Sequence, residues 1–275
     1  MQVNTTCTIL TKDAPNPHAV RFTLDVGNMV RDSFASPGQF VYIKCGEERL
    51  LRRPISVCAC QENQGHDTLT IVFEVRGAGT DWLARREPGD RLDVLGLLGH
   101  GFRMDPKGRY LLVGGGIGVP PLLGCAKYAA SRGGEVHACL GFRDEGHMML
   151  TGDFAEYCRG LHVISDDGST GRKGFVTELV EEFLAAEACA GDACTACCGA
   201  PARPVILACG PRPMLKGVAA LAERYGVPCQ VSLEERMGCG VGACLVCACD
   251  MADGHRKHVC KDGPVFDAKE VDWND

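Results

Sequence analysis

A cysteine motif near the carboxyl end constrains this chain more than any other feature. Its members are Cys239, Cys244, Cys247 and Cys260, and their spacing is C-x4-C-x2-C-x12-C. Four thiolates with the first three at this spacing are the ligand set of plant-type [2Fe-2S] clusters. The sequence therefore predicts that these four cysteines bind one [2Fe-2S] cluster.

Glycines beside these cysteines support that interpretation. Gly238, Gly240 and Gly242 allow a loop with positive φ angles and with backbone N–H groups turned toward the sulfurs. A structural zinc ion is the main alternative, because thiolates also suit zinc, but zinc sites usually pair two C-x2-4-C knuckles. Only one such knuckle is present here. Cys249 is expected to point away from the ligands and to be structural.

Composition and charge exclude several classes of function. The net charge of −6, with basic residues clustered only in short pairs, gives no footprint for nucleic acid. The amino terminus lacks the basic region and long apolar run of a signal peptide. The apolar stretch 111–126 is too short and too interrupted to span a bilayer. We therefore expect a cytoplasmic protein with reduced thiols, since a disulfide scaffold belongs to small secreted domains.

The first part of the chain, residues 1–105, has the pattern of an antiparallel β-barrel. Short β-rich segments alternate with turn signals at spacings typical of such barrels. One short helix is possible over 80–86. The expected strands are 6–10, 19–24, 40–44, 56–59, 68–75 and 91–95.

From residue 106 to 226 the pattern changes to alternating strands and helices, which predicts a doubly wound α/β domain. The remaining residues, 227–275, form the expected cluster-binding domain. Within the α/β domain the expected strands are 110–113, 135–140, 161–164 and 204–209, and the expected helices follow 118 up to 131, then 177–188 and 213–225.

A second cysteine-rich stretch, from Cys189 to Cys198, repeats the spacing C-x4-C-x2-C. It has no fourth cysteine at a ferredoxin-like distance, and it lies in an alanine-rich segment that we expect to be an exposed connection. An adventitious loop is the favoured interpretation, and a second metal or redox site is the alternative.

A glycine-rich turn follows the first strand of the α/β domain. It comprises Gly114, Gly115, Gly116, Ile117 and Gly118, and such a turn lets the backbone approach a pyrophosphate at a helix start. A proline at 120 or 121 suits the first helical turn. The alternative is a tight strand-to-helix turn without a ligand, because a valine replaces the third glycine of the G-x-G-x-x-G pattern.

The residues after the next strand bear on the choice of dinucleotide. Asp144 and Glu145 would disfavour a 2′-phosphate near the ribose, although Arg143 precedes them. We therefore expect NADH to be preferred over NADPH.

Two barrel segments are candidate flavin contacts. In 52–56 an arginine can pair with phosphate, a hydroxyl can bond to a flavin edge, and a proline fixes the turn. The segment 77–80 is either a plain hairpin or a phosphate-binding turn with Thr80 as the helix N-cap.

The order of these motifs resembles the ferredoxin-NADP reductase superfamily over residues 1–226. With the cysteine motif added, the whole chain is similar to the electron-transfer subunits of type 1B dihydroorotate dehydrogenases. The resemblance implies FAD on the barrel, NAD(H) on the α/β domain and a [2Fe-2S] cluster at the carboxyl end. The implied FAD contacts are Arg53, Pro54, Ile55, Ser56, Val72, Phe73, Glu74, Gly79 and Thr80. The implied NAD(H) contacts are Gly114, Gly115, Gly116, Ile117 and Gly118, with Cys209, Gly210 and Pro211 near the nicotinamide. The superfamily usually has an aromatic residue where Ile55 stands.

The resemblance also implies an activity and a partner. Electrons would pass from NADH through FAD and the cluster to an FMN-containing dihydroorotate dehydrogenase catalytic subunit, in a heterotetramer of two of each, in pyrimidine (UMP) biosynthesis. No catalytic acid or base is required, and no orotate site is expected in this chain. Two alternatives remain: a subunit of another oxidoreductase, such as a sulfide dehydrogenase or a bifurcating transhydrogenase, or a metal-binding regulatory module without turnover.

The expected docking surface is the cluster domain itself. Met237, Leu245 and Val246 flank the cysteines, and if exposed they would form an apolar patch of the kind that marks an interface. The alternative is that they pack inward beneath the loop.

Overall fold

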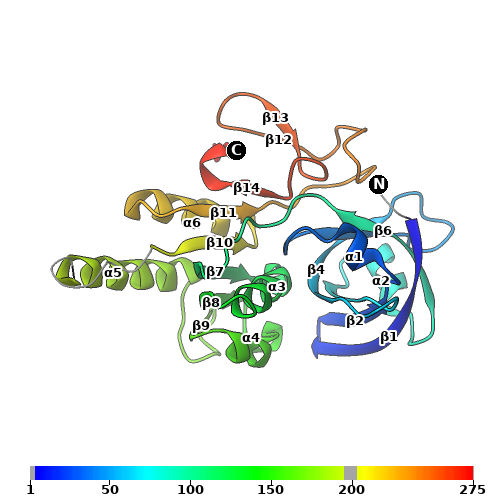
Figure 1. The fold of residues 1–275 in the computed structure, drawn as a ribbon, viewed down its shortest axis with the longest axis horizontal. Helices are drawn as coiled ribbons and strands as arrows, with labels where there is room; N and C mark the ends of the chain where they lie inside the picture. The colour runs from blue at the N-terminus through cyan, green and yellow to red at the C-terminus, as the bar shows by residue number, and fades with distance from the viewer. Residues whose placement is uncertain (1–3, 195–202, 275) are drawn as a thin grey trace.

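The amino-terminal part of the computed structural model is a closed barrel of six antiparallel strands (Figure 1). The structure describes residues 4–194 and 203–274. The strands pair in the order β1-β2-β5-β4-β3-β6, so the predicted barrel is confirmed. Their bounds are β1 (Asn4–Asn16), β2 (Ala19–Asp25), β3 (Phe40–Ile43), β4 (Arg53–Gln61), β5 (Thr68–Glu74) and β6 (Arg91–Leu98).

Two short helices accompany the barrel, α1 (Met29–Ser33) and α2 (Ala78–Ala84). The predicted helix over 80–86 exists but begins two residues earlier, so Thr80 is its third residue and not its N-cap. The reason is local. The Thr80 hydroxyl accepts hydrogen bonds from the N–H groups of Arg76 and Gly77 and donates one to the Gly77 carbonyl, which closes the turn ahead of it.

The second body is a six-stranded sheet with the order β14-β11-β10-β7-β8-β9. Neighbouring strands are parallel except for β14 against β11. The strands are β7 (Arg109–Gly115), β8 (Glu135–Phe142), β9 (Gly160–Ser165), β10 (Val205–Cys209), β11 (Cys229–Ser232) and β14 (Val265–Asp267). The helices are α3 (Val119–Ala130), α4 (Thr151–Tyr157), α5 (Val176–Cys194) and α6 (Arg212–Tyr225), with the 3-10 turns η1 (Gly116–Gly118), η2 (Glu145–His147) and η3 (Ala268–Glu270).

Helices cover both faces of this sheet, as the doubly wound prediction requires. Along β7, Leu112 packs in the cluster beneath α3 and α4, whereas Leu111 and Val113 pack in the cluster beneath α5 and α6. Successive strand residues point to opposite faces, so an unbroken apolar run such as 110–113 belongs to a strand buried on both sides.

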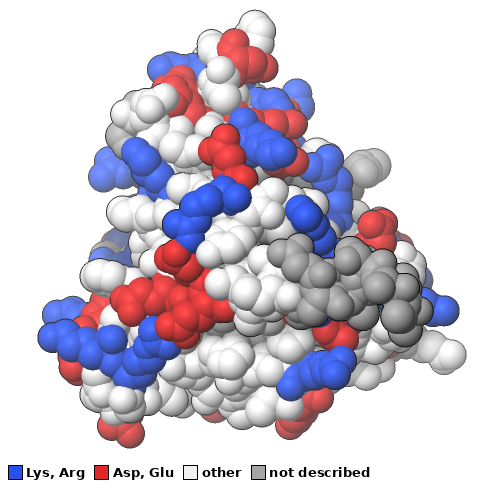
Figure 2. Space-filling model, turned by 90° about the vertical axis from the view of Figure 1, so that its left-hand side faces the viewer, with Lys and Arg blue, Asp and Glu red and all other residues white. Residues whose placement is uncertain are grey.

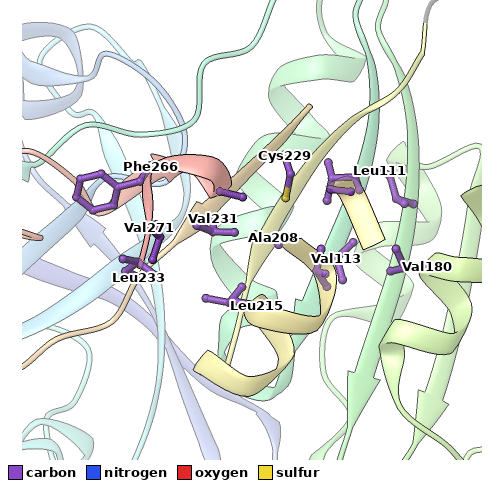
Figure 3. Close-up of a cluster of buried hydrophobic side chains, with 14 of the residues drawn as sticks. Leu111, Val113, Val180, Ala208, Leu215, Cys229, Val231, Leu233, Phe266 and Val271 are labelled. Carbon is purple, nitrogen blue, oxygen red and sulfur yellow. The ribbon is translucent and has the colours of Figure 1, made fainter. Parts of the chain in front are cut away.

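The chain after residue 226 adds strands to the same sheet. Figure 3 shows Phe266 and Val271 from this segment in one buried cluster with Leu111, Val113 and Val180. A two-stranded ribbon, β12 (Ala248–Asp250) with β13 (Arg256–His258), completes the segment. The cluster-binding segment is therefore fixed to the sheet by a strand and by core side chains. The division into three domains at 105 and 226 stays a prediction.

Helix α5 is longer than the sequence suggested. It runs six residues past the predicted end at 188, so Cys189 and Cys194 belong to a helix and not to a connecting loop. Alanine is the strongest helix former, which explains the extension through this alanine-rich stretch. Cys197 and Cys198 lie outside the described residues, so the interpretation of the whole stretch stays a prediction.

Charges of both signs are interspersed on the face where α5 projects (Figure 2). Ion pairs account for part of this pattern, for example Arg172 with Glu182 and Arg224 with Glu181. Across residues 4–194 and 203–274 no helix combines the length and the apolar character needed to cross a membrane.

Candidate cofactor pockets and cluster loop

The carboxyl ends of the parallel strands meet at one edge of the sheet. Cys209 of β10 is in register with Gly114 of β7 and with Ser232 of β11. A cleft of about 700 Å³ lies between this edge and the barrel, and we call it the edge cleft. Predicted residues that line it are Gly115, Gly116, Ile117, Gly118, Gly210 and Pro211.

The glycines of this turn serve different purposes. A Cβ atom on Gly118 would lie 2.3 Å from the Cys209 carbonyl oxygen, and one on Gly114 would lie 2.8 Å from a Val119 methyl carbon. Packing alone therefore requires both glycines. Gly116 has φ +51° and no neighbouring heavy atom within 4 Å of a built Cβ. Among the turn glycines, Gly116 leaves its surroundings open for a ligand.

Cys209 does not line the edge cleft. Its side chain is 2% exposed, and burial raises the pKa of the thiol to about 12. Gly210 and Pro211 face the cleft in its place. The motif thus lies near the expected nicotinamide position, while its sulfur is part of the core.

A second pocket, which we call the barrel pocket, lies against β4 and β5. It gathers segments that are far apart in the sequence, as the resemblance predicts. The predicted residues that line it are Pro54, Ile55, Ser56, Val72, Phe73, Glu74 and Thr80, and Ile117 joins them from the α/β domain.

Arg53 and Gly79 lie beside the barrel pocket, against each other. A Cβ atom on Gly79 would fall 2.4 Å from Arg53 Nε, so only glycine lets the guanidinium lie over the start of α2. A cation held next to a glycine backbone suits a pyrophosphate. The contact between Arg53 and Gly79 is therefore the evidence that the residues of the barrel suit FAD.

Sequence reasoning missed several residues of the barrel pocket. They come mainly from the carboxyl end of β11 and from the chain that follows it. The carboxyl end of β11 lies at the same edge of the sheet as Gly115. The place of β11 in the strand order was the signal that could have identified these residues. The missed residues are Phe40, Arg76, Pro121, Ser232, Leu233, Glu234, Glu235, Met237 and Pro264.

The residues after β8 differ from the prediction for the dinucleotide. Arg143 and His147 line the edge cleft, whereas Asp144 and Glu145 are not among its lining residues. The Asp144 carboxylate instead lies 2.7 Å from His147 Nδ1, and this hydrogen bond lowers the pKa of Asp144. Asp144 is thus engaged with His147, and the preference for NADH stays a prediction.

The four motif cysteines lie in the segment 237–247 and at Cys260, which together we call the cluster loop. Within this loop the Cys260 N–H donates to Cys247 Sγ at 3.4 Å, and the interaction with Cys244 helps to lower the pKa of Cys239. Four cysteine ligands are what a [2Fe-2S] cluster needs. Within the described residues, no three cysteine, histidine or acidic side chains gather around a single point.

Backbone N–H groups point at the sulfurs of the cluster loop. Cys239 Sγ accepts from Val241 N at 3.4 Å and from Ala243 N at 3.2 Å, and Cys260 Sγ accepts from Gly242 N at 3.1 Å. Burial raises the pKa of Cys239, but these N–H donors outweigh it and lower that pKa to about 6. Such donors favour a thiolate, the form that binds iron. The donor set therefore fits the cluster.

The loop glycines have two roles. Gly240 and Gly242 have φ angles of +73° and +81°, as predicted. Gly238 is not among the positive-φ glycines, and a Cβ atom there would lie 3.0 Å from Cys244 Sγ, so this glycine makes room for a sulfur. Tyr42 of β3 anchors the loop by donating from its hydroxyl toward the carbonyls of Met237 and Gly238, at 2.9 and 3.0 Å.

The residues around the cysteines are placed largely as expected. Cys249 is buried and its thiol donates to the Lys257 carbonyl, which fits a structural role. Leu245 and Val246 are 66% and 55% exposed, so they form the expected apolar patch. Met237 is partly buried and packs against the core, so it contributes less to this exposed patch than Leu245 and Val246 do.

Comparisons with known proteins agree with this arrangement. Residues 234–272 match the model of the iron-sulfur cluster binding domain of dihydroorotate dehydrogenase B. Two relatives carry the name dihydroorotate dehydrogenase B (NAD(+)), electron transfer subunit. The one from Geobacillus thermodenitrificans is 46% identical over 86% of each chain, and the one from Desulforamulus reducens is 36% identical over 94% of each.

Solved structures share the fold. An electron-bifurcating NADH-dependent reduced ferredoxin-NADP oxidoreductase superposes with a TM-score of 0.81 at 30% identity, covering 97% of this chain and 90% of that one. A ferredoxin-NADP+ reductase from Plasmodium falciparum superposes with a TM-score of 0.63 at 10% identity, covering 83% and 96%. This second likeness concerns the fold alone.

Proposed function

This chain belongs to the family of dihydroorotate dehydrogenase B electron transfer subunits, and we propose that it carries electrons between NAD(H) and a separate catalytic subunit. The edge cleft takes NAD(H), the barrel pocket takes FAD, and the cluster loop takes a [2Fe-2S] cluster. FAD bound in the barrel pocket would supply hydride exchange with the dinucleotide and single-electron exchange with the cluster. The chain thereby links two-electron to one-electron chemistry.

One observation carries this proposal: the three sites share walls. Glu74, Arg76, Ile117 and Glu234 line both the edge cleft and the barrel pocket. Met237 lines the barrel pocket two residues before Cys239, and its carbonyl accepts from Tyr42. NAD(H), FAD and the cluster held in these sites would therefore be neighbours in that order, which is the order in which electrons pass.

The residues of this chain bind and orient, and none is assigned as a catalytic acid or base. Arg53 over Gly79 suits the flavin pyrophosphate, and Gly116 suits that of the dinucleotide. Ile55 and Phe73 supply apolar walls for the flavin ring. Hydride transfer between two bound cofactors needs their alignment and the exclusion of water, both of which these walls supply.

The relatives are named as subunits, which implies a catalytic partner. We propose that the partner of this chain is an FMN-containing dihydroorotate dehydrogenase subunit. Two copies of each chain would form a heterotetramer that acts in pyrimidine synthesis. The docking surface is the cluster loop, because Leu245 and Val246 are exposed next to the cysteines.

Activity of the purified chain tests the division of labour. Loaded with FAD and cluster, it should reduce an artificial acceptor with NADH and be inert toward dihydroorotate. Adding the FMN subunit should restore dihydroorotate oxidation coupled to NAD+. Reduction of the flavin by dihydroorotate without a second protein would contradict the proposal.

Substitution of the apolar patch tests the docking surface. Leu245→Ser with Val246→Ser should weaken co-purification with the partner while FAD and cluster content stay unchanged. Phe175→Ser is the matched control, because Phe175 is also 66% exposed but lies at the start of α5. Equal loss of partner in both variants would exclude the cluster loop as the docking surface.

A second candidate is the electron-transfer subunit of a bifurcating oxidoreductase. The 30% identical structure described above, which covers nearly the whole chain, favours it. Identification of the protein that co-purifies decides between the two: an FMN protein that oxidises dihydroorotate supports the first, and a flavoprotein that exchanges electrons with ferredoxin and NADP supports the second.

A further inference from the structure

Two histidine rings, one from the barrel and one from the α/β domain, stack on each other in the lining of the edge cleft. His18 lies in the turn between β1 and β2 of the barrel, and His147 ends η2 in the α/β domain. Their ring centroids are 4.1 Å apart and their planes differ by 12°. Both residues line the edge cleft.

One asparagine holds both histidines in place. The Asn16 side chain is buried; its Nδ2 donates to the His147 carbonyl at 2.9 Å, and its Oδ1 accepts from His18 N at 2.9 Å. The Asp144 carboxylate fixes the His147 ring from the other side, at 2.7 Å from Nδ1. The stack is therefore oriented before any ligand arrives, which lowers the entropy cost of binding.

A cation four residues before His147 also lines the cleft. Arg143 lines it, and among residues 4–194 and 203–274 its guanidinium has no ion pair or side-chain hydrogen bond. The wall that the cleft shares with the barrel pocket is formed by Glu74, Arg76, Ile117 and Glu234, and neither histidine nor Arg143 lines the barrel pocket. The cleft thus has one wall shared with the flavin position, and its flat aromatic pair and its cation are not part of that wall.

We propose that the His18–His147 stack is the binding platform for the adenine ring of the dinucleotide, with Arg143 pairing with the adenosine-side phosphate. This rests on the proposed function, since hydride transfer places the nicotinamide at the shared wall and so leaves the adenosine for residues of the cleft outside that wall. Flat rings stack on one another favourably, and a guanidinium pairs well with phosphate. The barrel, through its β1–β2 turn, thereby takes part in dinucleotide binding and in positioning the cofactor across both domains.

A purely structural stack is the alternative, and truncated cofactors distinguish the two. Reduced nicotinamide mononucleotide carries the hydride but lacks the adenosine. His18→Ala should raise KM for NADH about three- to tenfold, the loss of one stacked ring, with kcat unchanged. The kinetics with the mononucleotide should not change. Inhibition by AMP should weaken by the same factor as NADH binding.

Two variants serve as controls. His18→Phe keeps a flat ring and should restore most of the NADH affinity. His66→Ala removes another exposed barrel histidine, which pairs with Asp25 outside the cleft, and should leave both cofactors unaffected.

Each remaining outcome refutes the proposal in a distinct way. If His18→Ala changes neither cofactor, the stack binds no adenine. If it weakens both cofactors equally, the stack acts on the architecture of the cleft. If the FAD-loaded wild-type chain oxidises neither cofactor, the proposed function itself fails, and the inference fails with it.

Discussion

Cysteines in the cluster loop and cysteines in the sheet have opposite surroundings in the same chain. In the loop, Cys239 accepts two backbone N–H bonds and its pKa falls to about 6. In the sheet domain, Cys139 is fully buried on β8, and burial raises the pKa of its thiol to about 12. Residue type is identical, so the difference comes from the surroundings of each sulfur: burial in the sheet and N–H donors in the loop.

Only thiols that can readily form thiolates are suited to bind iron, and the two regions differ in this respect. Glycines in the loop turn amides toward the thiols, whereas in β8 the amides are used by the neighbouring parallel strands. Burial alone does not separate the two sets, since it also raises the pKa of Cys260 to about 12, with Cys247 adding to the effect. What distinguishes the loop is that backbone N–H groups donate to its sulfurs.

Loss of one loop cysteine should have the largest effect. Cys247→Ala removes a ligand, so the visible iron-sulfur absorption should disappear while bound flavin remains. Iron, sulfide and FAD contents of the purified protein measure this. Cys249→Ala is the matched control two residues away and should keep the cluster. Full iron and sulfide in Cys247→Ala would show that the motif does not bind the cluster.

Distortion of the loop backbone should come next. Gly240→Ala combines a positive φ angle with a Cβ atom 2.7 Å from Tyr42 Cδ1, so we expect a loss of about 2–5 kcal/mol in unfolding free energy. Cluster retention should fall with it. Gly254→Ala is the control, because φ is +79° there and no heavy atom lies within 4 Å. It should cost about 1–2 kcal/mol, and equal losses would rule out the Tyr42 contact as the cause.

A change in the sheet should have a smaller and purely structural effect. Cys139→Ser places a hydroxyl in an apolar cluster and should lower the unfolding free energy by about 1–3 kcal/mol. Denaturant melts measure this, and cluster and FAD contents should match the wild type. A loss of iron in this variant would mean that core thiols also influence the cluster.

The sequence alone predicted the barrel and the doubly wound domain, which the structure confirms, and the four cysteine ligands, which stay a prediction. The barrel and sheet followed from alternation and from apolar runs, because those patterns reflect burial on one or two faces. The four cysteines followed from spacing, since a short loop can present them to one cluster with little help from the rest of the chain. Helix ends were less predictable. The Thr80 cap was wrong because a side-chain bond closed the preceding turn, and α5 ran on because alanine favours helix.

Tertiary structure alone decided which residues face the cofactor sites. Cys209 belonged to a recognisable motif but its sulfur is buried, and Asp144 is engaged with His147 instead of facing the edge cleft. Glu234 and His18 carried no local signal, yet both line the cleft between the domains. The physical reason is distance along the chain: a cleft between two bodies takes its walls from strand ends and turns that only the packed fold brings together.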